Sequence, residues 1–413
     1  MSEVREWIVR QNLKLFAVSL GVVALASSSA GAEGGQGSAT RYPIVLSHHW
    51  SGTAYAAFRG NQYTPNVPEG ERPFPAWGVK HALERDGAVV YQPDKLDFGS
   101  NENRGRLLYR KCAGATLSDK LCQGQNPQAV DGVELAMLDY CGDPAKHRGQ
   151  YPSIAACLRD VKINVICHSQ GCPDSRYMIN AMTNRLSGRP MHEHVASWTS
   201  IAGANKGTAI ADVALGCTDG QCGPDYVAAL DYLCAGLGLC SSAPGFHDSV
   251  VALSRKYMTQ TMDMSCNPAT STCPPSFNRA YPNPPNVYWQ SYSGYIRWAH
   301  SCYSDHQAGW LLVGAYEGLN DGYISLESQR FLTAGPSASD PPTRVHDRGI
   351  VTGTPRVFGL VHPGISHMGF SNNLVPGLPG VDCPGVGNDE AGYAWDREAF
   401  YVNVARDLRA MGF

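Results

Sequence analysis

A serine at the end of an apolar segment is the residue of this sequence best suited to chemistry. Residues 163–177 read INVICHSQGCPDSRY, an apolar run that passes through His-Ser-Gln-Gly into a helical pattern. This context is typical of a nucleophile elbow, in which a strained turn lifts a serine hydroxyl off the edge of a sheet. The strict G-x-S-x-G pattern is broken because Cys167 stands two residues before the serine. We expect Ser169 to be a nucleophile.

A serine hydroxyl needs a base to take its proton, and the base needs a carboxylate that orients it. In the fold that has a nucleophile elbow, the three catalytic residues follow one another along the chain in the order serine, acid, histidine. The acid best placed in a turn is Asp321, within EGLNDGYIS, because Asn-Asp-Gly forms tight loops that hold a carboxylate outward. Asp305 and Asp347 are the alternatives, and a turn aspartate that only bonds its own backbone is another interpretation.

Two histidines near the end of the chain are candidates for the base. The stretch RVFGLVHPGISHMGF contains His362 directly after an apolar run and His367 further into the following loop. Reactive groups of α/β folds lie in loops at the carboxyl ends of strands, which favours His367. His362 is then a packing or hydrogen-bonding residue.

The oxyanion of an acyl-transfer reaction needs two amides that already point toward it. One amide belongs to the residue after the nucleophile, here Gln170, and the other to a loop after an early strand. RYPIVLSHHWSG supplies such a strand and loop. We expect the second donor to be the main chain of Trp50 or His49, while the two histidine side chains could serve only as loop filler.

The elements that must position these residues alternate between short apolar runs and helical patterns. Such alternation predicts an α/β fold with a mostly parallel central sheet and helices on both faces. Helical patterns span 77–86 and 174–186. A Cys-, Gly- and Pro-rich stretch from Cys217 to Cys273 interrupts the rhythm and predicts a cysteine-rich cap or lid insertion at about 213–280, although its apolar pieces could simply pack on the body. The expected strands are 43–46, 88–91, 161–167, 196–201 and 357–361.

Targeting and cysteine usage predict export. Basic residues precede an apolar run that ends in small residues, so residues 1–32 are expected to be a secretory signal peptide and 33–413 a single domain. About twelve apolar residues are too few to span a bilayer, so no stable membrane insertion is expected. All fourteen cysteines lie beyond this segment and fit disulfides in an oxidising compartment rather than metal sites. With 17% charged residues and a net charge of −3, no nucleic-acid partner is expected.

Several separate segments resemble the secreted bacterial triacylglycerol lipases that depend on a dedicated foldase. YPIVLSHHWSG is similar to the family's YPIVLxHGxxG oxyanion segment, which points to Trp50, and INVICHSQGCPDSRY is similar to its VNLIGHSxGGPxxRY. SWTSIAGANKGTAIADV, FNRAYPN and the closing DREAFYVNVARDLRAMGF resemble further family segments. NDG and SHMGF fall where the family has its acid and base, which supports Asp321 and His367. The resemblance implies an α/β-hydrolase fold and a foldase chaperone as a partner.

Three departures from the family pattern bear on the site. The family commonly holds calcium with an aspartate two residues after its catalytic histidine, and Gly369 stands at that position, so no metal or other cofactor is expected. Both elbow glycines are replaced by cysteines, Cys167 and Cys172, which are either bonded to each other or two buried thiols. Residues 104–151 and 217–273 fit the family pattern poorly. The pocket, the lid and the substrate are therefore free to differ from those of the family.

The function expected from these residues is hydrolysis of carboxylic esters through an acyl-enzyme on Ser169. Acylglycerols or related apolar esters are the expected substrates of this secreted enzyme, which would leave the cell through the periplasm. The alternatives are an extracellular depolymerase of polyhydroxyalkanoate-type polyesters and, from another class, an inactive binding protein on the same fold. An intact set of serine, acid and histidine favours the enzyme.

Overall fold

The structure is a computed structural model of the chain, and it divides into two units, Met1–Gly35 and Gln36–Phe413. The predicted signal peptide, residues 1–32, lies outside the described residues. All elements below belong to the second unit. The described residues are 37–50, 54–58, 78–112, 129–218, 221–222, 244–296, 304–331, 344–351, 356–357, 360–361, 365–371 and 397–413.

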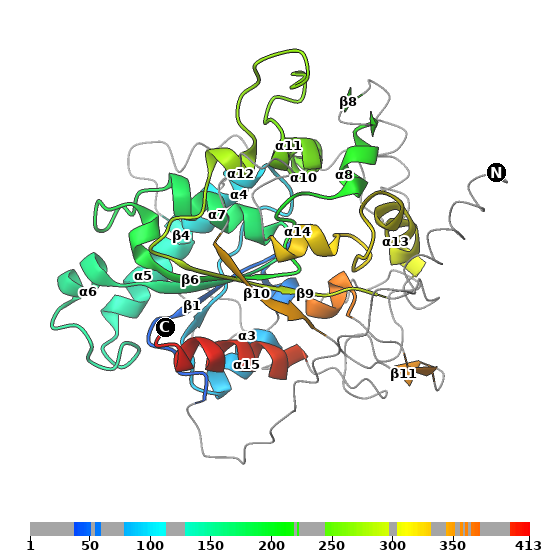
Figure 1. Cartoon of the computed structure of the whole chain (residues 1–413). Coiled ribbons are helices and arrows are strands. Elements are labelled where there is room, and N and C mark those ends of the chain that lie inside the picture. The colour runs from blue at the N-terminus through cyan, green and yellow to red at the C-terminus, as the bar shows by residue number, and fades with distance from the viewer. Residues whose placement is uncertain are drawn as a thin grey trace. The chain divides into compact units, whose positions relative to one another are not determined.

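A six-stranded parallel sheet forms the centre of the second unit (Figure 1). Its order is β10-β9-β6-β5-β1-β2, and every neighbouring pair runs parallel. The carboxyl ends of parallel strands lie at one edge of a sheet, so the loops after β1 and β5 emerge side by side. The strands are β1 Ile44–Ser47, β2 Val90–Tyr91, β5 Ile163–His168, β6 Val195–Ile201, β9 Tyr288–Ser293 and β10 Val345–Ile350.

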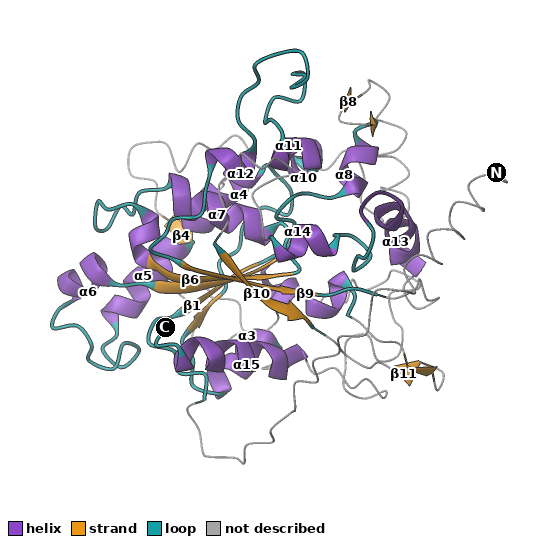
Figure 2. Ribbon diagram, viewed as in Figure 1, coloured by secondary structure: helices purple, strands orange, loops and turns teal. Residues whose placement is uncertain are grey.

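Helices cover both faces of this sheet (Figure 2). Successive strand side chains point to opposite faces, so Val45 joins one apolar cluster while Ile44 and Leu46 join the other. The first cluster includes side chains of α4 Asn101–Tyr109, α5 Val133–Gly142 and α7 Gly171–Ala181. The second packs on α3 Val79–Arg85 and α15 Arg397–Ala410. This two-sided burial explains why β1 and β5 consist mostly of apolar residues.

The remaining elements are short. The helices are α2 Ala54–Phe58, α6 Ile154–Asp160, η3 Met191–His194, α8 Ala209–Ala214, α10 Phe246–Leu253, α11 Arg255–Thr259, α12 Phe277–Ala280, α13 Ser304–Glu317, α14 Leu326–Arg330 and η5 His367–Phe370. The small strands are β3 Lys111–Cys112 with β4 Ala129–Asp131, β7 Cys217–Thr218 with β8 Gln221–Cys222, and β11 Arg356–Val357 with β12 Leu360–Val361, each pair antiparallel.

Four of the five strands expected from the sequence belong to the central sheet, with ends shifted by a few residues. The expected strand at 357–361 is wrong: β11 and β12 pair with each other in a separate antiparallel ribbon. Apolar character alone specifies neither the partner nor the direction of a strand, and here the nearest partner is the neighbouring segment. The mostly parallel sheet with helices on both faces is confirmed, and it is an α/β-hydrolase-like fold.

Two strands of the sheet were not expected, because their sequences are polar. β9 reads YWQSYS, and its Gln290 and Ser291 are fully buried. Burial is possible since Gln290 Nε2 donates to Thr199 Oγ1 at 2.9 Å and Ser291 Oγ donates to Arg330 O at 2.8 Å. β10, VHDRGI, is an edge strand whose residues alternate between exposed and partly buried. The hydrogen-bond partners of β9 lie elsewhere in the chain. The local pattern of apolar residues therefore predicts neither β9 nor β10.

The described parts of the expected insertion at about 213–280 pack on the body. Phe246 of α10 joins a cluster with Phe98 and Ala204, and its ring centroid lies 5.4 Å from that of Phe98. Cys234 and Cys240 lie outside the described residues, whereas Cys266 and Cys273 form a disulfide. A cap or lid at this position stays a prediction. No helix in the described parts of the chain combines the length and the apolar character needed to span a membrane.

Candidate active site

Ser169 lies on a sharp turn between β5 and α7. Its backbone φ is 55°, in the left-handed region that L-residues rarely adopt. The surroundings hold this conformation: Ser169 N donates to Ile201 O at 3.3 Å, and Ser169 O accepts from Cys172 N at 3.1 Å and Ala204 N at 3.3 Å. The residue is 6% exposed. Strain that is retained in this way is typical of functional turns, and this geometry is that of the predicted elbow.

Gly171 allows α7 to begin directly against the loop after β1. A Cβ at this position would overlap the carbonyl oxygen of Ser47 and lie 2.5 Å from that of His48. Both obstacles are backbone atoms of the oxyanion segment and cannot swing aside. The elbow and the oxyanion segment are therefore in contact because residue 171 has no side chain.

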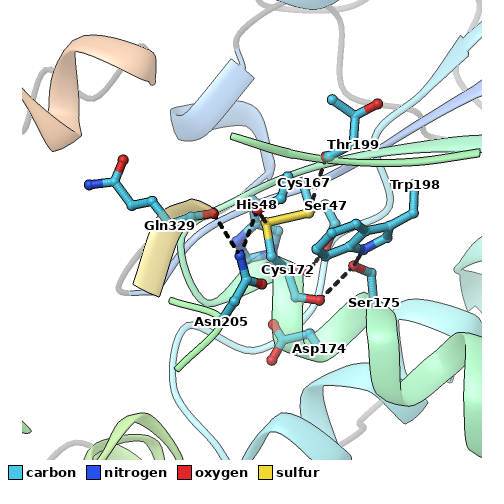
Figure 3. Close-up of a disulfide and its surroundings, with 12 residues drawn as sticks. Ser47, His48, Cys167, Cys172, Asp174, Ser175, Trp198, Thr199, Asn205 and Gln329 are labelled. Atoms are coloured by element: carbon cyan, nitrogen blue, oxygen red, sulfur yellow. Dashed lines mark hydrogen bonds between the residues drawn. A yellow bond between two sulfur atoms is a disulfide. The ribbon is translucent and has the colours of Figure 1, made fainter. Parts of the chain in front are cut away.

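A disulfide between Cys167 and Cys172 joins the end of β5 to the first turn of α7 (Figure 3), and Ser169 lies between the two cysteines in the sequence. The two Cα atoms are 4.9 Å apart, and both side chains are fully buried. Ser200 Oγ lies 3.4 Å from Cys172 Sγ and accepts a hydrogen bond from Asn205 Nδ2 at 2.9 Å. The structure thus contains the local crosslink that was one of the two expectations for this pair.

Asp321 and His367 meet in a buried pair. Asp321 Oδ2 lies 2.7 Å from His367 Nδ1, and the aspartate is fully buried. Its other oxygen, Oδ1, accepts from the amides of Tyr323 at 3.0 Å and Ile324 at 2.8 Å, which fixes the carboxylate in the turn. The His367 amide also donates to Asp321 O at 2.9 Å. Because Nδ1 is engaged, Nε2 is the ring nitrogen left to exchange protons.

His168, the residue before the serine, connects this pair to the elbow. His168 Nε2 lies 3.0 Å from His367 O, and the two ring centroids are 4.7 Å apart. Burial holds the pKa of His168 well below its usual range, and the neighbouring His367 acts in the same direction. A neutral His168 can donate from Nε2 to the carbonyl without placing a second charge beside His367. Among the described contacts, Ser169 Oγ and His367 are not hydrogen-bonded to each other, and such bonds often form only with substrate.

The alternative acids lie elsewhere. Asp347 is in β10, where its Oδ2 accepts from Arg330 Nε at 2.7 Å, and Asp305 is in α13. Among the described contacts, Asp347 does not bind His367 as Asp321 does, and the side chain of Asp305 lies outside the described part of the structure. His362 lies outside the described residues.

The oxyanion segment after β1 is held by buried polar groups. Arg104 Nη2 donates to His49 O at 2.7 Å, and His48 Nδ1 lies 3.0 Å from the same oxygen. In a trans peptide the N–H points away from the preceding carbonyl, so these contacts direct the Trp50 amide to the opposite side. Within the described residues, neither this amide nor that of Gln170 donates a hydrogen bond.

The residues that hold Arg104 were missed by the sequence analysis. Arg104 Nε lies 2.8 Å and Lys95 Nζ 2.7 Å from Asp174 Oδ2, and all three side chains are fully buried. Lys95 Nζ also donates to Ser47 Oγ at 2.8 Å. Burial lowers the pKa of Lys95 to about 7, although Asp174 acts in the other direction. Lys95 and Arg104 are far from Asp174 in the sequence, and no local pattern predicts that the three residues form a cluster. Only the fold brings them together.

No group of three or more His, Cys, Asp or Glu side chains in the described parts of the chain is arranged to hold a metal ion. Gly369, where a calcium-binding aspartate was considered, instead donates from its amide to Ser366 Oγ at 3.2 Å within η5. Independence from calcium stays a prediction, which a chelation experiment tests below.

Parts of the chain are similar to known lipases. Residues 128–263 match the family model described as Lipase (class 2). A triacylglycerol lipase of Vibrio cholerae is 31% identical over 205 residues, which are 49% of this chain and 45% of that relative. The chain therefore spans less than half the length of the curated relative that it matches. These two matches confirm the resemblance to bacterial triacylglycerol lipases over the segments that they cover.

Solved structures of low sequence identity are similar to most of the chain. Lipase 1 from Pelosinus fermentans is 13% identical with a TM-score of 0.48, and the match covers 90% of this chain and 99% of that one. Staphylococcus hyicus lipase is 15% identical with a TM-score of 0.47, and the match covers 92% and 98%.

Proposed function

We propose that the protein hydrolyses carboxylic esters with an apolar acyl part, acylglycerols above all, through an acyl-enzyme on Ser169. The observation that carries this proposal is the buried Asp321–His367 pair in contact with His168, the residue before a serine held at positive φ on an elbow. The resemblance of residues 128–263 to class 2 lipases supports the ester substrate.

In the proposed mechanism, His367 Nε2 takes the proton of Ser169 as the hydroxyl oxygen attacks the ester carbonyl. Asp321 keeps the other ring nitrogen protonated and stabilises the imidazolium. The amides of Gln170 and Trp50 would bind the tetrahedral oxyanion. His367 then protonates the leaving alcohol, and a water molecule, deprotonated by the same histidine, releases the acid and restores the serine.

The experiment that tests this proposal replaces the nucleophile. Ser169→Ala should keep the circular dichroism spectrum and the melting temperature close to those of the wild type, while kcat on nitrophenyl butyrate falls by several orders of magnitude. The variant should also fail to react with a fluorophosphonate probe. Ser153→Ala, which removes the side-chain cap of α6 and contacts none of the site residues, is the matched control. Near-normal turnover by Ser169→Ala would refute the assignment of the elbow.

A substrate panel tests the class of ester. We expect activity on short nitrophenyl esters and on emulsified triglyceride; activity on solid polyhydroxyalkanoate in place of triglyceride would identify a polyester depolymerase. A protein that binds esters but does not react with fluorophosphonate would be the inactive binding protein considered from the sequence.

We also propose that the protein is exported from the cytoplasm and that a foldase assists its folding. The disulfides Cys141–Cys157 and Cys266–Cys273 support residence in an oxidising compartment outside the cytoplasm. A foldase partner is proposed from the lipase resemblance alone. Refolding of the denatured, oxidised protein without any other protein tests it: recovery of full activity would contradict a foldase requirement.

A further inference from the structure

Helix α10, Phe246–Leu253, contacts both segments that carry the proposed oxyanion donors. The helix belongs to the stretch that the sequence predicts to be a cap or lid, far along the chain from Trp50 and Gln170. Two of its residues make the contacts, Ser249 through hydrogen bonds and Phe246 through its ring.

The polar contact passes through the hydroxyl of Ser249, which accepts from Gly99 N at 2.6 Å and donates to Gly99 O at 2.9 Å. Gly99 O also accepts from Gln170 Nε2 at 3.0 Å, and the same Nε2 donates to Asn101 Oδ1 at 3.2 Å. Asn101 is in turn bonded to α10, because its Nδ2 donates to Ala252 O at 3.0 Å. The three residues whose side chains take part are fully buried, where the low dielectric constant strengthens hydrogen bonds.

This network ends at the peptide unit that carries the first proposed donor. Ser169 O and Gln170 N belong to one planar peptide, in which the N–H and the C=O point in opposite directions. The amides of Cys172 and Ala204 donate to Ser169 O and fix one side of that plane. The side chain of Gln170 fixes the Cα atom at its other end. A shift of Gly99 would therefore displace the Gln170 amide relative to the serine.

The aromatic contact reaches the second proposed donor. The ring centroid of Phe246 lies 5.6 Å from that of Trp50 and 5.4 Å from that of Phe98. Phe98 lies 5.3 Å from Trp50, edge to face, so the three rings form one cluster. An aromatic pair contributes about 0.5–1.5 kcal/mol beyond the area that it buries. Loss of the Phe246 ring would leave Trp50 less firmly held.

We propose that α10 positions the oxyanion hole, meaning the amides of Gln170 and Trp50, with Ser249 holding the first through Gly99 and Phe246 holding the second. Ser249 and Phe246 are positioning residues, because each acts through a backbone amide. The physical basis is that oxyanion donors stabilise a transition state when they already point at the developing charge. The inference rests on the proposed function, since the oxyanion is the one that forms on acylation of the serine.

Ser249→Ala tests the polar contact, because it removes the hydroxyl from Gly99 without adding volume. Loss of a whole oxyanion donor lowers kcat about 10²- to 10³-fold, and a donor that is displaced but still present should lose part of this, roughly tenfold. We expect kcat on nitrophenyl butyrate, per site titrated with a fluorophosphonate, to fall by that factor. KM should stay close to that of the wild type, because the oxyanion contact is made in the transition state.

Inhibition by butylboronic acid supplies a readout that a merely structural role would not move. The boron accepts a bond from Ser169 Oγ, the serine proton passes to His367, and one oxygen of the resulting anion occupies the hole. The inhibition constant should rise by the same factor as kcat falls. A loss of stability alone would reduce the number of titrated sites and leave the inhibition constant unchanged.

Phe246→Leu tests the aromatic contact independently, because leucine keeps an apolar side chain without a ring. We expect kcat to fall and the inhibition constant to rise together by roughly two- to tenfold, the range that the energy of one aromatic pair corresponds to. Ser197→Ala is the matched control. Ser197 is also fully buried, and it donates to Asn164 Oδ1 at 2.8 Å near the amino ends of β6 and β5, at the opposite edge of the sheet. Its loss should change neither constant.

An unchanged inhibition constant in Ser249→Ala or in Phe246→Leu would overturn the inference, and so would an equal rise in Ser197→Ala. The wild type distinguishes this failure from failure of the proposed function. A wild-type protein that neither reacts with the fluorophosphonate nor binds the boronic acid would refute the proposed function. A wild type that does both, with variants equal to it, would refute the role of α10 alone.

Discussion

Replacing Asp321 by asparagine tests the candidate acid without removing volume from a buried site. The carboxylate is fully buried and accepts three hydrogen bonds: Oδ2 accepts from His367 Nδ1 at 2.7 Å, and Oδ1 accepts from two amides at 2.8 and 3.0 Å. In Asp321→Asn the amide oxygen can keep both backbone donors, which forces the new NH2 group to face His367 Nδ1.

The consequence for catalysis follows from that orientation. An NH2 group needs an acceptor, so His367 would move its proton from Nδ1 to Nε2, and Nε2 could no longer accept the proton of Ser169. Loss of the correct tautomer in a serine triad lowers kcat by about 10⁴. Two of the three hydrogen bonds persist, and a hydrogen bond to a charged group contributes about 1.5–3 kcal/mol, so we expect the free energy of unfolding to fall by no more than that.

The assay combines kcat on nitrophenyl butyrate with urea denaturation of each variant. Asp347→Asn is the matched control, because Asp347 is an aspartate of β10 paired with Arg330 away from His367, and its kcat should stay within a few-fold of the wild type. An Asp321→Asn variant that keeps a tenth of the wild-type kcat, or an equal loss in Asp347→Asn, would refute the reasoning.

Three other predictions concern the elbow and the metal. Gly171→Ala should lower the free energy of unfolding by about 1–3 kcal/mol and reduce activity, because its Cβ meets fixed backbone oxygens; Gly142→Ala, with open space around it, should be neutral or stabilising in the same denaturation experiment. Peptide mapping without reduction should recover Cys167 linked to Cys172, and alkylation of either thiol in the native protein would contradict the crosslink. Chelation by EDTA should change neither activity nor melting temperature, whereas a loss restored by calcium would show a site built from other oxygens.

The elbow could be predicted from the sequence alone, because the residues that form it are neighbours in the chain. An apolar strand, a serine and a helix follow one another within fifteen residues of Ile163–Tyr177, and each depends on short-range chain geometry. Asp321 and His367 could be named as candidates for the acid and the base because each lies in a turn or loop of recognisable type and in the expected order. Strands such as β1 were predictable for a similar reason, because strands buried on both faces of a parallel sheet are rich in apolar residues.

Which of these residues contact each other, and which groups hold them in place, depends on the packing of distant parts of the chain. β9 is buried although polar, because partners such as Thr199 and Arg330 reach it from other elements. Lys95, Arg104 and Asp174 form a buried ion cluster that holds the oxyanion segment, yet each looks like an ordinary surface charge in the sequence. The hydrogen bonds between Ser249 and Gly99 are likewise invisible before folding. A hydrogen bond between distant residues has no local signature, because its energy depends on burial and direction that only the packed chain provides.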